Sequence, residues 1–190
     1  SDGGIQQLYL RPLDSLEAKP IAGTEGAVAP FFSPDGQWVG FFADGRLKKV
    51  SVSGGATVTL ASAPIPGGAS WSSQGSLALQ PALLAQGLQQ VSEEGGAPQP
   101  LTRLAKGELY HRWPEFLPGG EAVLFAGSET LATWTNAQIV VQPTRTGERK
   151  NLAEGTQPRY APTGHLLYAR SGTLMAAPFD ARSLTLSGAG

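Results

Sequence analysis

The sequence predicts an all-β protein built from repeats of a four-stranded antiparallel unit, and three observations favour that class. Glycine and proline together make up about a fifth of the 190 residues, against a usual ~12%, and they recur at intervals instead of forming one tract. Residues 31–60 (FFSPDGQWVGFFADGRLKKVSVSGGATVTL) contain four short apolar stretches separated by turn residues. The same order of aromatic residue and turn then returns three times along the chain.

The first unit begins with the apolar pair Phe31 and Phe32, which a tight turn at 33–36 ends. Pro34 presets φ at the first corner of this turn, and Gly36 accepts a backbone geometry that other residues resist. Three further strands are expected at 37–42, 47–52 and 57–60, with turns at 44–45 and 53–55 between them. Such a sheet cannot bury both faces alone, so it needs similar sheets stacked against it.

The repeats can be measured by the turn glycine. Gly36 recurs as Gly75, Gly120 and Gly164, at intervals of 39, 45 and 44 residues. An aromatic residue stands four positions before each of these glycines, and two positions earlier again stands a proline or alanine. The aromatic residues are Phe32, Trp71, Phe116 and Tyr160, and the preceding residues are Pro30, Ala69, Pro114 and Pro158. A period of about 40–45 residues with four strands per repeat is typical of the blades of a β-propeller.

The second halves of the repeats occur once more than the first halves. Residues 5–23 resemble the two outer strands of a blade, although no inner strands precede them. We therefore predict a partial or open β-propeller of about four and a half blades in a single domain, 1–190. It would consist of an outer half-blade with its loop at 1–29 and whole blades at 31–62, 70–104, 113–154 and 159–188.

The composition excludes several classes of function. The net charge is −1 and there is no basic block, which argues against nucleic-acid binding. The chain has no cysteine and only two histidines, so a cysteine-ligated or histidine-rich metal site is excluded. No apolar run approaches the ~20 residues that span a bilayer, so we expect no membrane insertion by this segment. The compartment stays open, and the first residues look like the middle of a longer protein.

The turn Ser33-Pro34-Asp35-Gly36 after an aromatic residue, the Asp-Gly and Gly-Gly turns and the repeat period resemble those of TolB-like β-propellers, which are related to WD-repeat proteins. More narrowly, LYLRPLDSLEAKPIAGTEGAVAPFFSPDGQWVGFFADGRLKKVSVSGGA and RYAPTGHLLYARSGTLMAAPFDARSLTLSG are similar to the propeller segment that follows the kinase domain in many bacterial serine/threonine kinases. That resemblance implies a sensing or binding segment of a receptor-type kinase, outside the cytoplasm where a membrane anchor separates the two parts.

No catalytic constellation accompanies this resemblance. The chain lacks the glycine-rich loop, the catalytic aspartate motif and the DFG motif of kinases, and it has no G-x-S-x-G elbow of hydrolases. The carboxylates Asp35 and Asp44 stand in turns, where they stabilise the backbone, and His165 follows a turn at the start of a strand. We therefore expect no enzyme activity, cofactor or metal in this segment.

The best candidates for binding residues lie in the loops that lead into the innermost strands, because those loops line one rim of a propeller's central channel. The candidates are Glu25, Glu108, His111, Arg112, Trp113, Glu115 and Arg159, together with Trp134 from a long loop in the third blade. They would bind a protein, a peptide or a small ligand. The alternative, which the need for contacts between blades favours, is that Arg112, Glu115 and Arg159 form salt bridges between adjacent blades while Trp113 packs between them.

Three functions remain open at this point. The leading prediction is a non-catalytic binding or sensing module, with recognition on the channel rim. The second is an enzyme, or a propeller attached to a hydrolase, with its active site on that rim. The third is a structural repeat that self-associates, because an open propeller exposes strand edges. We expect the chain either to stay an open arc or to form a homo-oligomer with another copy, in which the hairpin at 5–21 would pair with the partner.

Overall fold

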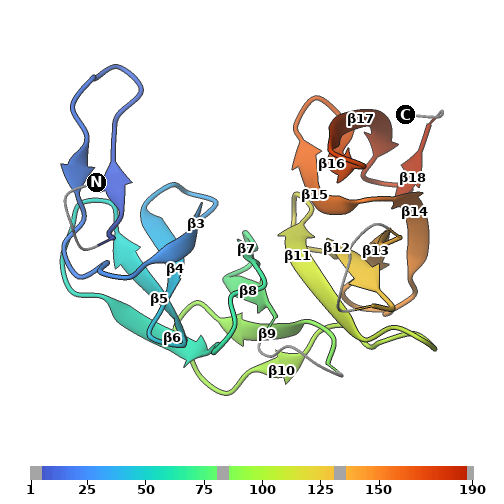
Figure 1. The fold of residues 1–190 in the computed structure, drawn as a ribbon, viewed down its shortest axis with the longest axis horizontal. Coiled ribbons are helices and arrows are strands. Elements are labelled where there is room, and N and C mark those ends of the chain that lie inside the picture. The colour runs from blue at the N-terminus through green and yellow to red at the C-terminus, as the bar shows by residue number, and fades with distance from the viewer. Residues whose placement is uncertain (1–5, 81–85, 131–135, 188–190) are drawn as a thin grey trace.

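A computed structural model describes residues 6–80, 86–130 and 136–187 of the chain. The described residues form strands, turns and loops, and no helix among them could cross a membrane. The strands form four antiparallel sheets of four strands and one sheet of two strands, and the sheets follow one another along an open arc (Figure 1). This arrangement confirms the all-β propeller predicted from the turns and the repeat period.

Each four-stranded sheet is a meander in which consecutive strands pair, with the first strand toward the concave side of the arc and the fourth toward the outside (Figure 1). The N-terminal hairpin contains β1 (Tyr9–Leu10) and β2 (Lys19–Pro20). The first blade contains β3 (Val28–Phe32), β4 (Trp38–Ala43), β5 (Arg46–Ser51) and β6 (Val58–Ser62). The second contains β7 (Ala69–Trp71), β8 (Ser76–Leu79), β9 (Gln89–Ser92) and β10 (Gln99–Pro100).

The remaining two blades have the same order. The third contains β11 (Tyr110–Phe116), β12 (Ala122–Ser128), β13 (Gln138–Pro143) and β14 (Lys150–Glu154). The fourth contains β15 (Thr156–Ala161), β16 (His165–Arg170), β17 (Thr173–Asp180) and β18 (Thr185–Leu186). β1 and β2 correspond to the third and fourth strands of a blade, as the sequence predicts for residues 5–23.

The apolar core is divided among the spaces between successive sheets. Four clusters of buried side chains lie between the hairpin and the first blade, and between each blade and the next. The middle strands of a blade contribute side chains to the clusters on both faces of their sheet, because successive side chains point to opposite faces. In β12, Val123 and Phe125 face the second blade while Leu124 faces the fourth. Each whole sheet is therefore held by stacking, as expected for a sheet that cannot bury both faces alone.

The first strands begin earlier than the sequence indicated, and this corrects one interpretation. The sequence places the start of the third blade at residue 113, but β11 begins at Tyr110, so His111 and Arg112 lie within a strand and not in the loop before it. The first blade, which the sequence places at 31–62, likewise begins earlier, with β3 at Val28. The prolines mark bulges inside the strands and not strand starts, because pairing resumes on both sides of an extra, unpaired residue.

The bulge is itself a repeated device. The residue before the proline or alanine of each blade has positive φ: 48° at Ala29, 93° at Gly68, 51° at Trp113 and 53° at Gln157. Three of these four residues are not glycine, so the local strain, about 1–3 kcal/mol for each, must be overcome by the surrounding packing. Two positions further on stand Phe31, Ser70, Glu115 and Arg159, and the aromatic residues of the repeat follow them directly. A residue with positive φ thus precedes equivalent side chains in all four blades, and in the first, third and fourth blades it lies in a bulge.

Candidate functional site

A central cavity of about 650 Å³ lies where the first strands of the four blades converge. Its lining includes, from each blade, the residue two positions after the one with positive φ and the aromatic residue that follows it. These residues are Phe31, Phe32, Ser70, Trp71, Glu115, Phe116, Arg159 and Tyr160. The cavity therefore has a mainly aromatic wall with a hydroxyl group and two charged groups at positions that are equivalent by repeat.

The two charged residues of this wall form an ion pair between the third and fourth blades. Arg159 Nη1 lies 2.6 Å from Glu115 Oε2, and the side chains are 55% and 23% exposed. Burial raises the pKa of Glu115, although the charge and hydrogen bond of Arg159 oppose this change. Because the Arg159 side chain is more than half exposed, its guanidinium can reach a ligand in the cavity without displacing packed side chains.

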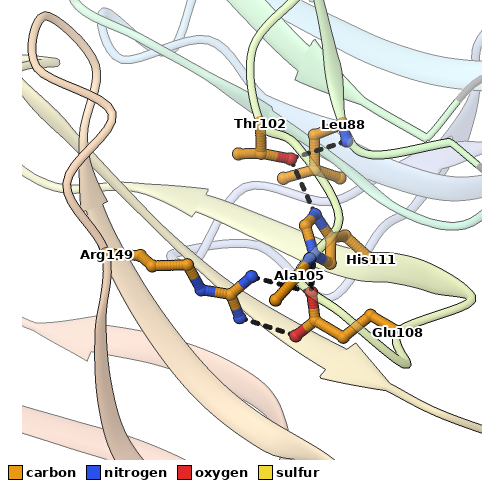
Figure 2. Close-up of polar contacts among 6 residues, drawn as sticks. All are labelled: Leu88, Thr102, Ala105, Glu108, His111 and Arg149. Carbon is orange, nitrogen blue, oxygen red and sulfur yellow. Dashed lines mark hydrogen bonds and ion pairs between the residues drawn. The ribbon is translucent and has the colours of Figure 1, made fainter.

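A second polar cluster surrounds His111 of β11 and is largely enclosed, with the side chains of Glu108 and Arg149 9% and 22% exposed. His111 is fully buried, and its ring lies 4.3 Å from the ring of Phe125, centroid to centroid. Its Nδ1 lies 2.7 Å from Thr102 Oγ1, and its Nε2 lies 3.0 Å from Glu108 Oε2. Figure 2 shows these side chains in a line, with Arg149 approaching the far side of Glu108.

Arg149 binds Glu108 through both of its terminal nitrogens, at 2.6 and 2.7 Å. The backbone N–H of Ala105 donates a further hydrogen bond of 2.7 Å to the same carboxylate. Burial on its own would raise the pKa of Glu108, but the hydrogen bonds from His111, Arg149 and Ala105 outweigh it and hold this pKa well below its ordinary value. Burial lowers the pKa of His111 against the opposing influence of Glu108.

These contacts fix the direction of each hydrogen bond. A charged Glu108 can only accept, so the neutral imidazole donates from Nε2 and accepts at Nδ1 from the hydroxyl of Thr102. The Thr102 oxygen in turn accepts the N–H of Leu88 at 2.8 Å. The cluster thus joins the second blade, through Leu88 and Thr102, to the third blade.

Two glycines make this close approach possible. A Cβ on Gly127 would lie 2.5 Å from a carboxylate oxygen of Glu108, and a Cβ on Gly87 would lie 2.2 Å from the carbonyl oxygen of Thr102. Neither residue stands at a positive-φ position, so space, and not backbone conformation, is what excludes a side chain there.

Thr102, His111 and Glu108 have the chemical order of a hydroxyl–imidazole–carboxylate relay. In a nucleophilic relay the hydroxyl must reach a substrate, and the carboxylate serves chiefly to orient the imidazole. Here Thr102 is 4% exposed and its oxygen already binds both Leu88 and His111, while Arg149 binds the carboxylate. The arrangement acts as an interblade clamp and leaves no face of the hydroxyl for a substrate.

Of the other candidates predicted from the sequence, two contact the second blade and one lies on the surface. Arg112 Nε donates to Gln80 Oε1 at 3.2 Å, and its guanidinium lies 5.5 Å from the centroid of the Trp113 ring. The backbone N–H of Trp113 donates to the carbonyl of Gly67 at 3.0 Å. Arg112 and Trp113 therefore both contact the second blade. Glu25 is exposed in the turn before β3, away from the central cavity. Trp134 lies outside the described residues.

Several residues of the buried clamp and of the central cavity were not among the candidates predicted from the sequence. Arg149 and Thr102 complete the buried clamp, and Ser70 Oγ accepts the Phe116 N–H across the second and third blades at 2.9 Å. Ser70 could have been found, because it stands in the repeat at the position that Glu115 and Arg159 occupy. Arg149 could not, since it is 41 residues from Glu108 and stands at no repeated position. Within the described ranges, no three His, Asp or Glu side chains gather as a metal site.

Comparisons with known proteins place the fold and no particular activity. No family model and no curated protein matches the chain. Among solved structures, TolB from Acinetobacter baumannii is 18% identical with a TM-score of 0.69, and a putative TolB from Agrobacterium tumefaciens is 15% identical with a TM-score of 0.64. Each match covers 90% of this chain, which spans 46% and 64% of those proteins, respectively.

A third similar structure is a calcium-binding protein, regucalcin, from Agrobacterium tumefaciens, with 16% identity and a TM-score of 0.63 over 86% of this chain and 57% of that one. The similar structures also include enzymes, such as an oligogalacturonate lyase in complex with manganese. The narrower resemblance to kinase-attached propellers stays a prediction. The resemblance to TolB-like propellers is confirmed at the level of structure, and the chain has the fold of a TolB-like β-propeller.

Proposed function

We propose that this chain is a non-catalytic binding module whose ligand enters the central cavity between the four blades. One observation carries the proposal: equivalent side chains of all four blades, each two positions after a residue with positive φ, line one space of about 650 Å³. An apolar wall with a few polar groups is typical of ligand sites, in which the polar groups fix the ligand's orientation. The ligand we expect is a peptide, a segment of a protein, or a small molecule with both an apolar part and a charged group.

The ion pair at the wall supports this kind of ligand. Arg159 can bind a ligand carboxylate in the same two-pronged way in which guanidinium groups bind carboxylates generally. Glu115, with its raised pKa, would then be left to accept or donate a hydrogen bond according to its protonation. Among the aromatic side chains that line the cavity, Phe32 is 59% exposed and offers a flat surface for the apolar part of the ligand.

We further propose that the module serves a larger bacterial protein of the receptor-kinase type. The support for this step is the sequence resemblance of residues 8–56 and 159–188 to kinase-attached propellers. Binding in the cavity would then be communicated to the attached domain. Finding a kinase domain in the same polypeptide would support the step, and finding a hydrolase domain in its place would overturn it.

A second function, an enzyme with its site in the same cavity, has one observation in its favour. A carboxyl group with a raised pKa in a cavity is a property of general acids, and Glu115 has it. The described cavity wall brings no second carboxylate or histidine beside Glu115, so we favour binding over catalysis.

The experiment is a selection of peptides and small molecules that bind the immobilised chain, followed by measurements with cavity variants. We expect Arg159→Gln and Glu115→Gln to weaken the selected ligands at least ten-fold and Glu25→Gln, on the exposed turn, to leave them unchanged. Ligands that bind all three variants equally would contradict the proposal. Turnover of a selected compound that is lost in Glu115→Gln would favour the enzyme instead.

A further inference from the structure

A separate cavity of about 610 Å³, which we call the interblade groove, lies between the second and third blades. One of its walls is the segment at the end of β10 and after it, residues 100–101 and 103–105. The other wall comes from β13 and the turn that follows it, residues 142, 144–147 and 149. The interblade groove and the central cavity share no lining residue. Its volume lies within the range of about 300–1,000 Å³ that is typical of ligand sites.

The interblade groove brings arginines together without acidic residues. Arg103, Arg145 and Arg149 line it, and no Asp or Glu is among its described lining residues. Arg149 gives both of its terminal nitrogens to Glu108, so its charge is already balanced. Arg103 and Arg145 are exposed and form no ion pair within the described ranges. Because a guanidinium group stays charged at any physiological pH, two unbalanced positive charges line one space.

This positive charge is a local property of the groove. The whole chain has a net charge of −1. At two other junctions between blades, the cationic residues Lys49 and Arg159 each have a carboxylate of the neighbouring blade within 4 Å. The arginines of the interblade groove therefore differ from the cations that hold blades together, and they are free to bind an anion from solution.

Hydrogen bonds hold the two walls of the interblade groove in place. Gln142, which is 4% exposed, donates from Nε2 to the carbonyl of Leu101 at 3.1 Å, from one wall to the other. The N–H of Thr144 donates to the carbonyl of Glu121 at 2.8 Å, which fixes the start of the turn that carries Arg145. A site whose walls are fixed before binding loses less conformational entropy when its ligand arrives.

We propose that the interblade groove binds a small anion with two or more oxyanion groups, phosphate or carboxylate, through Arg103 and Arg145. A guanidinium group binds either oxyanion through two parallel hydrogen bonds, so two arginines suit a ligand with two such groups. The described lining has no aromatic residue, in contrast to the central cavity, so a compact polar ligand fits it better than one with a large apolar part. This site is additional to the proposed function of the central cavity and does not depend on it.

The test titrates the whole chain with pyrophosphate and with citrate in a calorimeter, at low ionic strength so that charge interactions are weakly screened. Glucose, which is similar in size and neutral, is the control. We expect saturable binding of at least one anion at a single site and no heat of binding for glucose. Binding of pyrophosphate alone would identify phosphate as the recognised group, and binding of citrate alone would identify carboxylate.

Two variants then locate the bound anion. Arg103→Gln and Arg145→Gln should each weaken it at least five-fold, and the double variant should abolish binding. Arg182→Gln is the matched control, because it removes the same charge from an exposed arginine of the fourth blade, and it should leave the affinity unchanged. The replaced side chains are exposed, so the thermal unfolding midpoint without anion should stay the same in all of these variants.

Three results would overturn the proposal. The first is the absence of saturable binding for both anions. The second is equal weakening in Arg182→Gln, which would show that the anions respond only to the net charge of the chain. The third is binding of hexaglutamate at least a hundred-fold tighter than either small anion, because the groove would then belong to an acidic segment of another protein.

Discussion

The two polar groups of the third blade, one around His111 and one around Glu115, occupy the same strand and have opposite surroundings. His111 is enclosed and its hydrogen bonds are complete on both ring nitrogens, whereas Glu115 faces the central cavity with Arg159 as its exposed partner. The bulge at Trp113 lies between the two groups. Polar residues at the start of a blade therefore do not by themselves indicate a binding site. What matters is which side of the bulge a residue stands on.

The largest expected effect is on the buried group. Glu108→Gln removes the negative charge that Arg149 and His111 share, and breaking one partner out of a largely buried pair costs about 3 kcal/mol. Urea unfolding should therefore show a loss of this size in the free energy of unfolding. Glu121→Gln, at an exposed carboxylate, is the matched control and should change it by less than about 0.5 kcal/mol. A loss below about 1 kcal/mol in Glu108→Gln would contradict the role of the clamp.

The pH dependence of stability should distinguish the same two groups. The folded-state pKa of His111 lies below its ordinary value of 6.5, so the unfolded chain takes up the proton first and stability falls as the pH falls through 6.5. Glu108 adds a further loss below its ordinary value of 4.5, because its folded-state pKa is lowered.

The raised pKa of Glu115 contributes with the opposite sign, so that the measurement is best made in Glu115→Gln. In that background, His111→Gln should abolish the loss between pH 7.5 and 5.5. If the loss of stability between pH 7.5 and 5.5 persists when His111 is replaced, the titration of another group causes it.

A smaller effect is expected at the junction of the first two blades, where a different kind of charge is buried. The Lys49 ammonium lies 4.7 Å from the Trp38 ring and 5.8 Å from the Trp71 ring, with Glu94 at 3.4 Å. Lys49→Met keeps the packing and loses the cation–π attraction, so thermal unfolding should show a loss of about 1 kcal/mol. Glu94→Gln should have little effect because that carboxylate is 82% exposed. Equal losses in the two variants would mean that the ion pair, and not the rings, holds the lysine.

The fold could be predicted from the sequence because turn residues and aromatic residues repeat in register. A turn equivalent to that at 33–36, with the glycine that ends it, recurs in every blade, and the interpretation of residues 5–23 as the outer half of a blade follows from the same alignment. The bulges could not be predicted, since a proline such as Pro114 is as typical of a strand's beginning as of a bulge. Positive φ at Trp113 is a product of tertiary packing that no local preference indicates.

The candidate site was predicted only in part. Glu115 and Arg159 were selected as polar residues in equivalent positions, and the pairing between adjacent blades that the sequence favoured for them is the one observed. Glu108 and His111 were selected on the same grounds, yet they are part of the clamp, because Thr102 and Arg149 meet them only in three dimensions. Sequence position could place these residues near the start of a blade but could not say which of them the neighbouring blade would enclose.

The most direct test of the account sets one residue of each group against the other. For a ligand selected on the native chain, the dissociation constant and the free energy of unfolding are measured for Arg159→Gln and for Glu108→Gln. We expect Arg159→Gln to weaken binding at least ten-fold and to change stability by less than about 1 kcal/mol, because a largely exposed ion pair contributes little. We expect the reverse for Glu108→Gln, measured where that variant is folded: lower stability with unchanged affinity. Loss of affinity in folded Glu108→Gln together with native affinity in Arg159→Gln would contradict the assignment of the central cavity as the binding site.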